Sequence, residues 1–241
     1  MTWSIVARGP GGEFGIAIAS RFFAVGMLCP HARSGVGAVA TQALVNPHYG
    51  PKGLDLLGSG FSPSSVIEKL LSEDEGQNHR QVHIIDAQGR VAAHTGSACV
   101  GWCGHYAGEG FSIAGNMLAG PQVLQATAEA FQRSAGQPLA ERLIAAMAAG
   151  EAAGGDKRGK QSAALRIHGD EDYAELDLRV DDHAEPIIEL QRLYEVSLQR
   201  FQPFVACLAG RHDPTGELDR ARIEARIEAF HAAGAAEPGQ A

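Results

Sequence analysis

The sequence lacks an excess of basic charge. Its 28 aspartate and glutamate residues outnumber its 20 lysine and arginine residues, which gives a formal net charge of −8. Domains that bind nucleic acid normally carry a basic face, and no extended basic stripe is present here. We therefore expect no nucleic acid partner, and we expect no membrane span and no membrane partner.

A secretory signal is also missing, because polar and turn residues interrupt the N-terminal segment at RGPGGE. Cytoplasmic residence is the resulting expectation. The four cysteines then read as reduced thiols, and their spacing provides no disulfide framework. Cys99, Cys103 and His105 lie together in CVGWCGH, but no second Cys or His pair follows at a zinc-ribbon or zinc-finger spacing. No metal is expected.

Two phosphate-binding loops are absent as well. The sequence has neither a G-x-G-x-x-G loop after a predicted strand nor a G-x-x-x-x-G-K-[ST] loop. We therefore expect no nucleotide cofactor, and no other cofactor is indicated.

The sequence does contain strand-length apolar runs separated by turn residues. The runs WSIVAR (3–8) and FGIAIAS (14–20) flank GPGGE, which predicts an antiparallel hairpin. A second hairpin is predicted where DAQGR joins QVHIID to VAAHT. Further strands are predicted in GVGAVATQAL, EGFSIAGNML, SAALRIH and YAELDLRVD, and helices in NPHYGPKGLDLLGSG, SPSSVIEKLLSE, GPQVLQATAEAFQRSAG and PLAERLIAAMAAGEAAGG.

This order predicts an α+β fold, a four-layer αββα sandwich of two antiparallel sheets, because the βαβ alternation of a doubly wound sheet is missing. Residues 1–183 are expected to form the sandwich. Residues 184–241 are expected to form a helical C-terminal extension with a flexible tail rich in Gly and Ala. The small-residue strand GIAIA and the apolar stripe after Pro186 favour a homo-oligomer.

Five segments resemble, in order, a bacterial family known as domain of unknown function 1028. They are TWSIVAR, ASRFFAVG, GVGAVATQALVNPHYGP, GNMLAGPQVL and GGDKRGKQSAAL, and they span roughly residues 1 to 183. The resemblance implies an N-terminal-nucleophile (Ntn) hydrolase fold, the αββα sandwich of proteasome subunits and several amidases. In that superfamily the first residue of the mature chain, a Thr, Ser or Cys, attacks an amide carbonyl, and its own α-amino group accepts the proton.

Under this resemblance Thr2 matches the nucleophile, because methionine before a small residue is normally removed. The stretch AIASR resembles the second strand of proteasome subunits: Ser20 and Arg21 match, whereas Ala19 occupies the position of an expected aspartate. A basic residue is expected near the nucleophile to lower the pKa of its amine and hydroxyl, and Arg21 and Arg33 are the candidates.

The resemblance also extends to a loop and to a strand end. GGDKRGKQSAALRI resembles the loop that places an aspartate and a serine beside the terminal amine. Asp156 matches the aspartate, Gln161 or Ser162 replaces the serine, and Arg158 is a further substrate-binding candidate.

Three more candidates lie at strand ends. Gly115 and Asn116, in AGNMLAGP, occupy the place where oxyanion donors are expected, and one such donor typically contributes about 3 kcal/mol. His94, at the end of VAAHT, is a candidate base or substrate-binding residue.

Together these residues predict hydrolysis of a C–N bond in a small amide, ureide or peptide-like substrate, with Thr2 as nucleophile. A second interpretation is a small-molecule-binding or scaffold protein that retains the fold without the chemistry, which Ala19 and the absence of an obvious nearby lysine suggest. A third is a thiol or zinc enzyme that uses Cys99, Cys103 and His105.

Overall fold

The computed structural model of the chain describes residues 2–235. Ten strands form two antiparallel sheets within that range. The six-stranded sheet has the order β10-β9-β2-β1-β8-β7, and the four-stranded sheet has the order β3-β4-β5-β6. The strands are β1 (Thr2–Arg8), β2 (Phe14–Ser20), β3 (Pro30–Arg33), β4 (Gly37–Ala43), β5 (Arg80–Asp86), β6 (Val91–Thr95), β7 (Trp102–Gly108), β8 (Phe111–Leu118), β9 (Ser162–His168) and β10 (Leu176–Val180).

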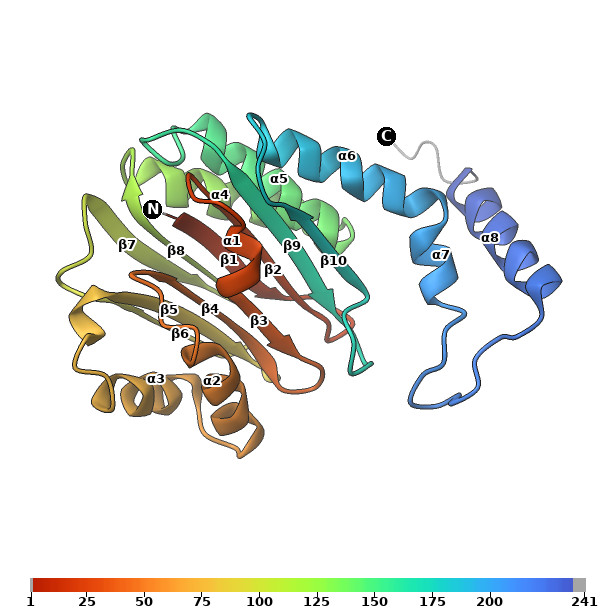
Figure 1. Cartoon of the computed structure of the whole chain (residues 1–241), viewed down its shortest axis with the longest axis horizontal. Coiled ribbons are helices and arrows are strands. Elements are labelled where there is room, and N and C mark those ends of the chain that lie inside the picture. Colours follow the sequence, from red (N-terminus) through yellow and green to blue (C-terminus); the bar gives the residue numbers. More distant parts are fainter. Residues whose placement is uncertain (1, 236–241) are drawn as a thin grey trace. The chain divides into compact units, whose positions relative to one another are not determined.

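Helices cover the outer face of each sheet, so the first unit has four layers (Figure 1). Helices α4 and α5 pack on the six-stranded sheet, and α2 and α3 pack on the four-stranded sheet. The helices are α1 (Val25–Leu28), α2 (Tyr49–Gly58), α3 (Pro63–Ser72), the 3₁₀ turn η1 (Gln77–His79), α4 (Gln122–Arg133), α5 (Leu139–Ala152), α6 (Pro186–Gln199), α7 (Phe201–Val205) and α8 (Arg220–Ala235). None of these described helices is both long enough and apolar enough to cross a membrane.

The chain divides into two compact units, residues 1–190 and 191–241. The division lies within α6, whereas the predicted extension begins before that helix. The second unit contains the end of α6, α7 and α8, and an ion pair between Arg200 and Glu224 links the C-terminal side of α6 to α8.

Strand β1 is central because it pairs with β2 on one side and with β8 on the other. The hairpin between β1 and β2 turns through Gly12, whose φ of +95° is a conformation that glycine adopts readily. Side chains alternate across a strand, so Thr2, Ser4 and Val6 face the second sheet while the intervening residues face the helices. This alternation decides on which side of the sheet the Thr2 hydroxyl lies.

The layer between the two sheets changes character along its length. At the hairpin end it is apolar, where Val6, Phe14 and Ile16 pack against Ala38 and Ile85. Toward the start of β1 it becomes polar, and the polar side chains there are almost completely buried: Ser4, Gln42, Gln81, His83, Ser112 and Asn116 are at most 2% exposed. Buried polar groups must bond to one another, and here they join the two sheets.

His83 links the apolar and polar parts. The Ser4 hydroxyl donates to Gln42 Oε1 at 2.6 Å, so it accepts a hydrogen bond from His83 Nε2 at 2.8 Å. His83 Nδ1 then accepts from the Ser112 hydroxyl at 3.2 Å. This tautomer directs the Ser4 proton toward Gln42 and not toward the imidazole, so Ser4 and His83 are not a catalytic pair.

The sequence prediction of an α+β fold with two antiparallel sheets and helices is confirmed. The prediction omits β7, because WCGHYAG contains two glycines and no regular apolar alternation. This strand lies at the edge of the six-stranded sheet and is half exposed, so little burial is available to leave a pattern in its sequence.

Replacing His83 with Gln should reduce the loss of unfolding free energy that accompanies a fall in pH below about 6.5. Burial, and then the charge of His105, lower the pKa of His83 to about 3, whereas an unfolded histidine titrates near 6.5. The unfolded chain therefore binds the extra proton first, and stability falls as the pH drops below about 6.5, by on the order of 3 kcal/mol at pH 4.

Urea unfolding at pH 4 to 7 measures this effect. His83→Gln is expected to be less stable than the wild type at pH 7 and to lose less stability on acidification, while the exposed His48→Gln keeps the wild-type slope. An unchanged slope in His83→Gln would contradict the assignment.

Candidate functional site

Thr2 begins the central strand at the polar end of the sandwich. It lies opposite Ser20 of β2 and Asn116 of β8 in the strand register. Its Oγ1 is 3.2 Å from Ser20 Oγ, and the whole residue is only 6% exposed. The Thr2 hydroxyl is therefore fixed on the inner face of the sheet.

Two side-chain amides hold the carbonyl of Thr2, and a third, that of Gln81, holds those two. The Thr2 carbonyl accepts from Asn116 Nδ2 at 3.3 Å and from Gln42 Nε2 at 3.4 Å. Both of these amides also donate to Gln81 Oε1, at 3.0 and 2.8 Å. Gln81 Nε2 in turn donates to the Gly115 carbonyl at 2.8 Å. Because Asn116 uses its side-chain N–H groups here, it positions Thr2 and is not set up to stabilise an oxyanion.

Two cavities lie near the start of β1, and each is lined by one of the two strand partners of Thr2, Ser20 or Asn116. The Ser20 cavity, about 270 Å³, is lined by Trp3, Ala19, Ser20, Glu151, Gly154, Gly155, Asp156, Lys157, Gly159, Lys160 and Pro186. The Asn116 cavity, also about 270 Å³, is lined by Ala43, Leu44, His79, Ala98, Cys99, Val100, Asn116 and Met117. Thr2 itself lines neither cavity, but it pairs in the strand register with one lining residue of each.

The wall of the Asn116 cavity contains strained backbone. Ala43 and Met117 have φ values of +69° and +52°, and these are two of the three described non-glycine residues with positive φ. Such strain persists only where the surrounding contacts enforce it, and it concentrates at functional sites.

Asp156 organises the loop on the other side of Thr2. Its side chain is 1% exposed and accepts from the backbone N–H groups of Arg21 and Arg158, at 2.9 and 2.8 Å. The Arg158 guanidinium also approaches it at 3.2 Å. Asp156 thus ties the turn after β2 to the loop that precedes β9.

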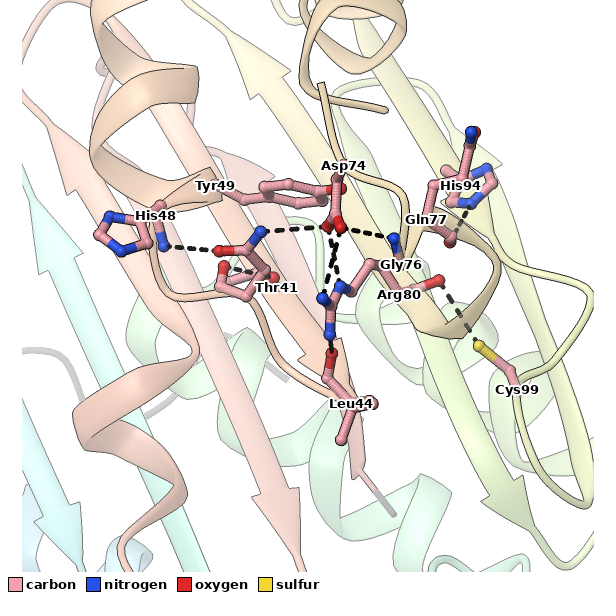
Figure 2. A network of polar contacts seen from close by, with 11 residues as sticks. Thr41, Leu44, His48, Tyr49, Asp74, Gly76, Gln77, Arg80, His94 and Cys99 are labelled. Carbon is pink, nitrogen blue, oxygen red and sulfur yellow. Dashed lines mark hydrogen bonds and ion pairs between the residues drawn. The ribbon is translucent and has the colours of Figure 1, made fainter. Parts of the chain in front are cut away.

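Asp74 is a second, partly buried carboxylate, and Figure 2 shows its network. It accepts from the Tyr49 hydroxyl at 2.8 Å, from Arg80 Nε at 2.9 Å and from Asn46 Nδ2 at 3.1 Å. The Arg80 bond is the largest influence that holds the pKa of Asp74 well below its usual range. Burial, and then the hydrogen bond to Asp74, raise the pKa of Tyr49.

This network supports the Asn116 cavity from behind. Arg80 Nη1 donates to the Leu44 carbonyl at 2.7 Å, and the Cys99 thiol lies 3.5 Å from the Arg80 carbonyl (Figure 2). Leu44 and Cys99 both line the cavity. A disturbance at Asp74 should therefore be felt in the cavity wall.

The predicted arginines do not reach the Thr2 hydroxyl. The Arg21 guanidinium turns to the Lys160 carbonyl at 2.8 Å. Arg33 pairs with Asp55 at 2.8 Å and lies opposite Gly37, five residues along β4 from Gln42, or roughly 16 Å of extended strand. The sequence contains the charges, but it does not show to which end of the sheet each belongs.

The other predicted residues occupy several positions around the site. The Ser162 hydroxyl donates to the Phe22 carbonyl at 2.6 Å, and the Gln161 amide donates to Asp182 at 3.1 Å. His94 Nε2, on β6, lies 3.1 Å from the carbonyl of Gln77, in the η1 turn that precedes β5 (Figure 2). Gly115 lies opposite Trp3 in the ladder. Of the predicted set, Thr2, Ser20, Asn116 and Asp156 are gathered at the start of β1.

The Cys99, Cys103 and His105 group does not converge on a common point. His105 Nδ1 bonds to the Thr95 hydroxyl at 2.9 Å, whereas the Cys103 thiol lies 3.8 Å from the Cys99 carbonyl. Between residues 2 and 235 no group of three or more His, Cys, Asp or Glu side chains is arranged to hold a metal ion.

The sequence prediction missed Gln42, Gln81 and Lys157. The two glutamines lie at inward-facing strand positions, and a polar residue in an otherwise apolar inward series is the signal that marks them. Lys157 lies in a loop of mixed charge, where nothing in the sequence distinguishes it from Arg158 and Lys160.

A family model and one solved structure relate this chain to the same family. The model of the family of unknown function DUF1028 matches residues 2–190. The crystal structure of a Silicibacter pomeroyi protein described by the same family model is 30% identical, covers 90% of this chain and 99% of its own, and superposes with a TM-score of 0.83. Anbu, an ancestral beta-subunit from Yersinia bercovieri, is 12% identical with a TM-score of 0.40, covering 81% of this chain and 94% of its own. No curated protein matches.

Replacing Asp74 with Asn should destabilise the protein by about 2 kcal/mol at pH 7, because Arg80 would keep its charge without a carboxylate partner. The side chains of Asp74 and Arg80 are only 13% and 17% exposed. Because the folded-state pKa of Asp74 is lowered, its contribution is present above about pH 4 and is lost as the pH falls further.

Asp55→Asn is the matched control, since its pair with Arg33 is 68% and 44% exposed and should contribute less than about 1 kcal/mol. Chemical unfolding at pH 7 compares the two variants. Equal losses of stability would show that the Asp74 network has no special role.

Proposed function

Because this chain belongs to the DUF1028 family, whose model states no activity, we propose a function from the site: an Ntn-type hydrolase that cleaves a C–N bond of a small amide, ureide or peptide-like substrate. The four-layer order of helices and sheets supports this proposal. The observation that carries it is the position of Thr2 at the start of the central strand, where its buried side chain lies in register with Ser20 and Asn116, which line the two cavities.

The reaction requires Thr2 to be the first residue of the mature chain. Thr2 Oγ1 then attacks the substrate carbonyl, and the hydroxyl proton passes to the Thr2 α-amine. The new O–C bond replaces the C–N bond, and the departing amine takes that proton. Water next hydrolyses the ester and restores the hydroxyl. An α-amine has a pKa near 8 and serves as a base around neutral pH.

The groups around Thr2 support positioning more than activation. Asn116 and Gln42 hold the Thr2 carbonyl, and Ser20 contacts its hydroxyl. No lysine or arginine among residues 2–235 is hydrogen-bonded to the Thr2 hydroxyl, which contacts Ser20 Oγ. In this proposal the Thr2 α-amine carries the base function.

A non-catalytic small-molecule-binding protein is the second candidate. It is favoured by Ala19, which lies beside Ser20 where a carboxylate was expected and which lines the Ser20 cavity with a methyl group. This candidate keeps both cavities as binding sites and assigns no chemistry to Thr2.

Replacing Thr2 with Ala should abolish hydrolysis of any amide that the wild type cleaves, by at least about 10³-fold, because the covalent nucleophile is lost. Thr2→Ser should retain measurable activity, since it keeps both the hydroxyl and the amine. The wild-type rate should rise with pH toward a plateau above about pH 8, as the amine loses its proton. Turnover of an amide panel measures all three effects.

A β-lactone that acylates hydroxyl nucleophiles provides a test that needs no known substrate. Mass spectrometry should locate one adduct on Thr2 in the wild type and in the Thr215→Ala control, and no adduct in Thr2→Ala. If activity and labelling are the same in Thr2→Ala as in the wild type, the hydrolase proposal fails and the binding protein becomes the better interpretation.

A further inference from the structure

Lys157 differs from the other cations of its loop. Arg158 pairs with Asp156 at 3.2 Å, and Lys160 pairs with Glu151 and Glu185 at 2.9 and 2.5 Å. Lys157 has no carboxylate partner among residues 2–235, and it is exposed. Because the neighbouring carboxylates already pair with Arg158 and Lys160, the Lys157 ammonium is left to pair with a ligand.

Lys157 lies close to both cavities. It lines the Ser20 cavity directly. A Cβ placed on Gly101 would be 3.3 Å from Lys157 Nζ and 3.0 Å from Met117 Cα, so the ammonium also lies beside the rim of the Asn116 cavity.

Backbone contacts hold this arrangement in place. Asp156, which precedes Lys157, forms a β-bridge with Leu118 at the end of β8. Met117 N donates to the Val100 carbonyl at 3.0 Å, which ties the loop before β7 to the same strand end. The position of Lys157 relative to both cavities therefore follows from the ladder that also positions Thr2.

The Asn116 cavity has a different chemistry. Ala43, Leu44, Ala98, Val100 and Met117 supply aliphatic surface, and Leu44 and Val100 are 63% and 62% exposed at its mouth. At about 270 Å³ it is slightly smaller than the pockets of roughly 300–1,000 Å³ that take drug-sized ligands. It fits one short aliphatic group.

We propose that the substrate is a small amide with a free carboxylate, of the N-acyl amino acid class, whose aliphatic group enters the Asn116 cavity and whose carboxylate binds Lys157 Nζ. The inference rests on the proposed function, because it requires the scissile carbonyl to reach Thr2, whose strand partners Ser20 and Asn116 line the two cavities. In a chain of net charge −8, a local cation is needed to select an anionic ligand.

Binding is measured in Thr2→Ala protein, so that turnover does not interfere. The probes are N-isovalerylglycine and N-isovalerylglycinamide, which share the aliphatic acyl group and differ in the carboxylate. We expect the acid to bind roughly 5- to 10-fold more tightly than the amide at low salt, as a partly exposed ion pair allows.

Lys157→Met, made in the same background, should remove this preference while leaving amide binding unchanged. Lys69→Met is the matched control. Lys69, on α3, lies over the Phe61 ring and lines neither cavity, so this variant should keep the preference. Val100→Asp should weaken both probes, since it places a charge at the mouth of the aliphatic cavity.

The outcomes separate this inference from the proposed function. Acid preference that depends on Lys157, together with no hydrolysis by the wild type, supports the inference and rejects the hydrolase. Hydrolysis that depends on Thr2, together with equal binding of the acid and the amide whether or not Lys157 is present, supports the hydrolase and rejects the inference. If neither probe binds, or if Lys157→Met leaves the preference intact, the inference is overturned.

Discussion

The site depends on the buried amide network that joins the two sheets at the carbonyl of Thr2. Gln42 and Gln81 come from one sheet and Asn116 from the other, and their hydrogen bonds converge on one another and on Thr2. Leaving one of these buried groups without a partner would cost more than a typical hydrogen bond contributes, so the network permits a single alignment of the sheets. The Thr2 hydroxyl is positioned as a consequence of that alignment.

Two carboxylates, one buried (Asp156) and one partly buried (Asp74), extend this order into the loops around the site. Asp156 fixes the turn after β2 and the loop that carries Lys157, while Asp74 fixes the segments behind the Asn116 cavity. Both carboxylates accept several hydrogen bonds. Ala43 and Met117, the two residues with positive φ, line the Asn116 cavity, whose wall the Asp74 network supports. The walls of the Ser20 and Asn116 cavities are therefore positioned in part by hydrogen bonds of Asp156, Asp74 and Arg80 to the neighbouring segments.

The fold was more predictable from the sequence than the site. Alternating apolar residues and the turn GPGGE located β1 and β2, because burial on the sheet faces leaves a periodic trace in the sequence. The half-exposed edge strand β7 leaves no such trace. Thr2, Ser20 and Asp156 were found through motifs, since each lies at a strand end or in the loop beside one.

The remaining site residues are set by pairings between strands that are far apart in sequence. Arg33 is a reasonable candidate from the sequence, but the β3–β4 register places it at the end of the sheet that is far from Thr2. Gln42 and Gln81 acquire their role only because β4 and β5 face β1 and β8 across the sandwich. Lys157 differs from its neighbours only through the ion pairs that Arg158 and Lys160 form, and the sequence does not show those pairs.

The mass of the purified intact protein tests most directly whether Thr2 is the nucleophile. We expect a mature chain that begins at Thr2 with a free α-amine, and a protein that retains Met1 quantitatively would contradict this mechanism.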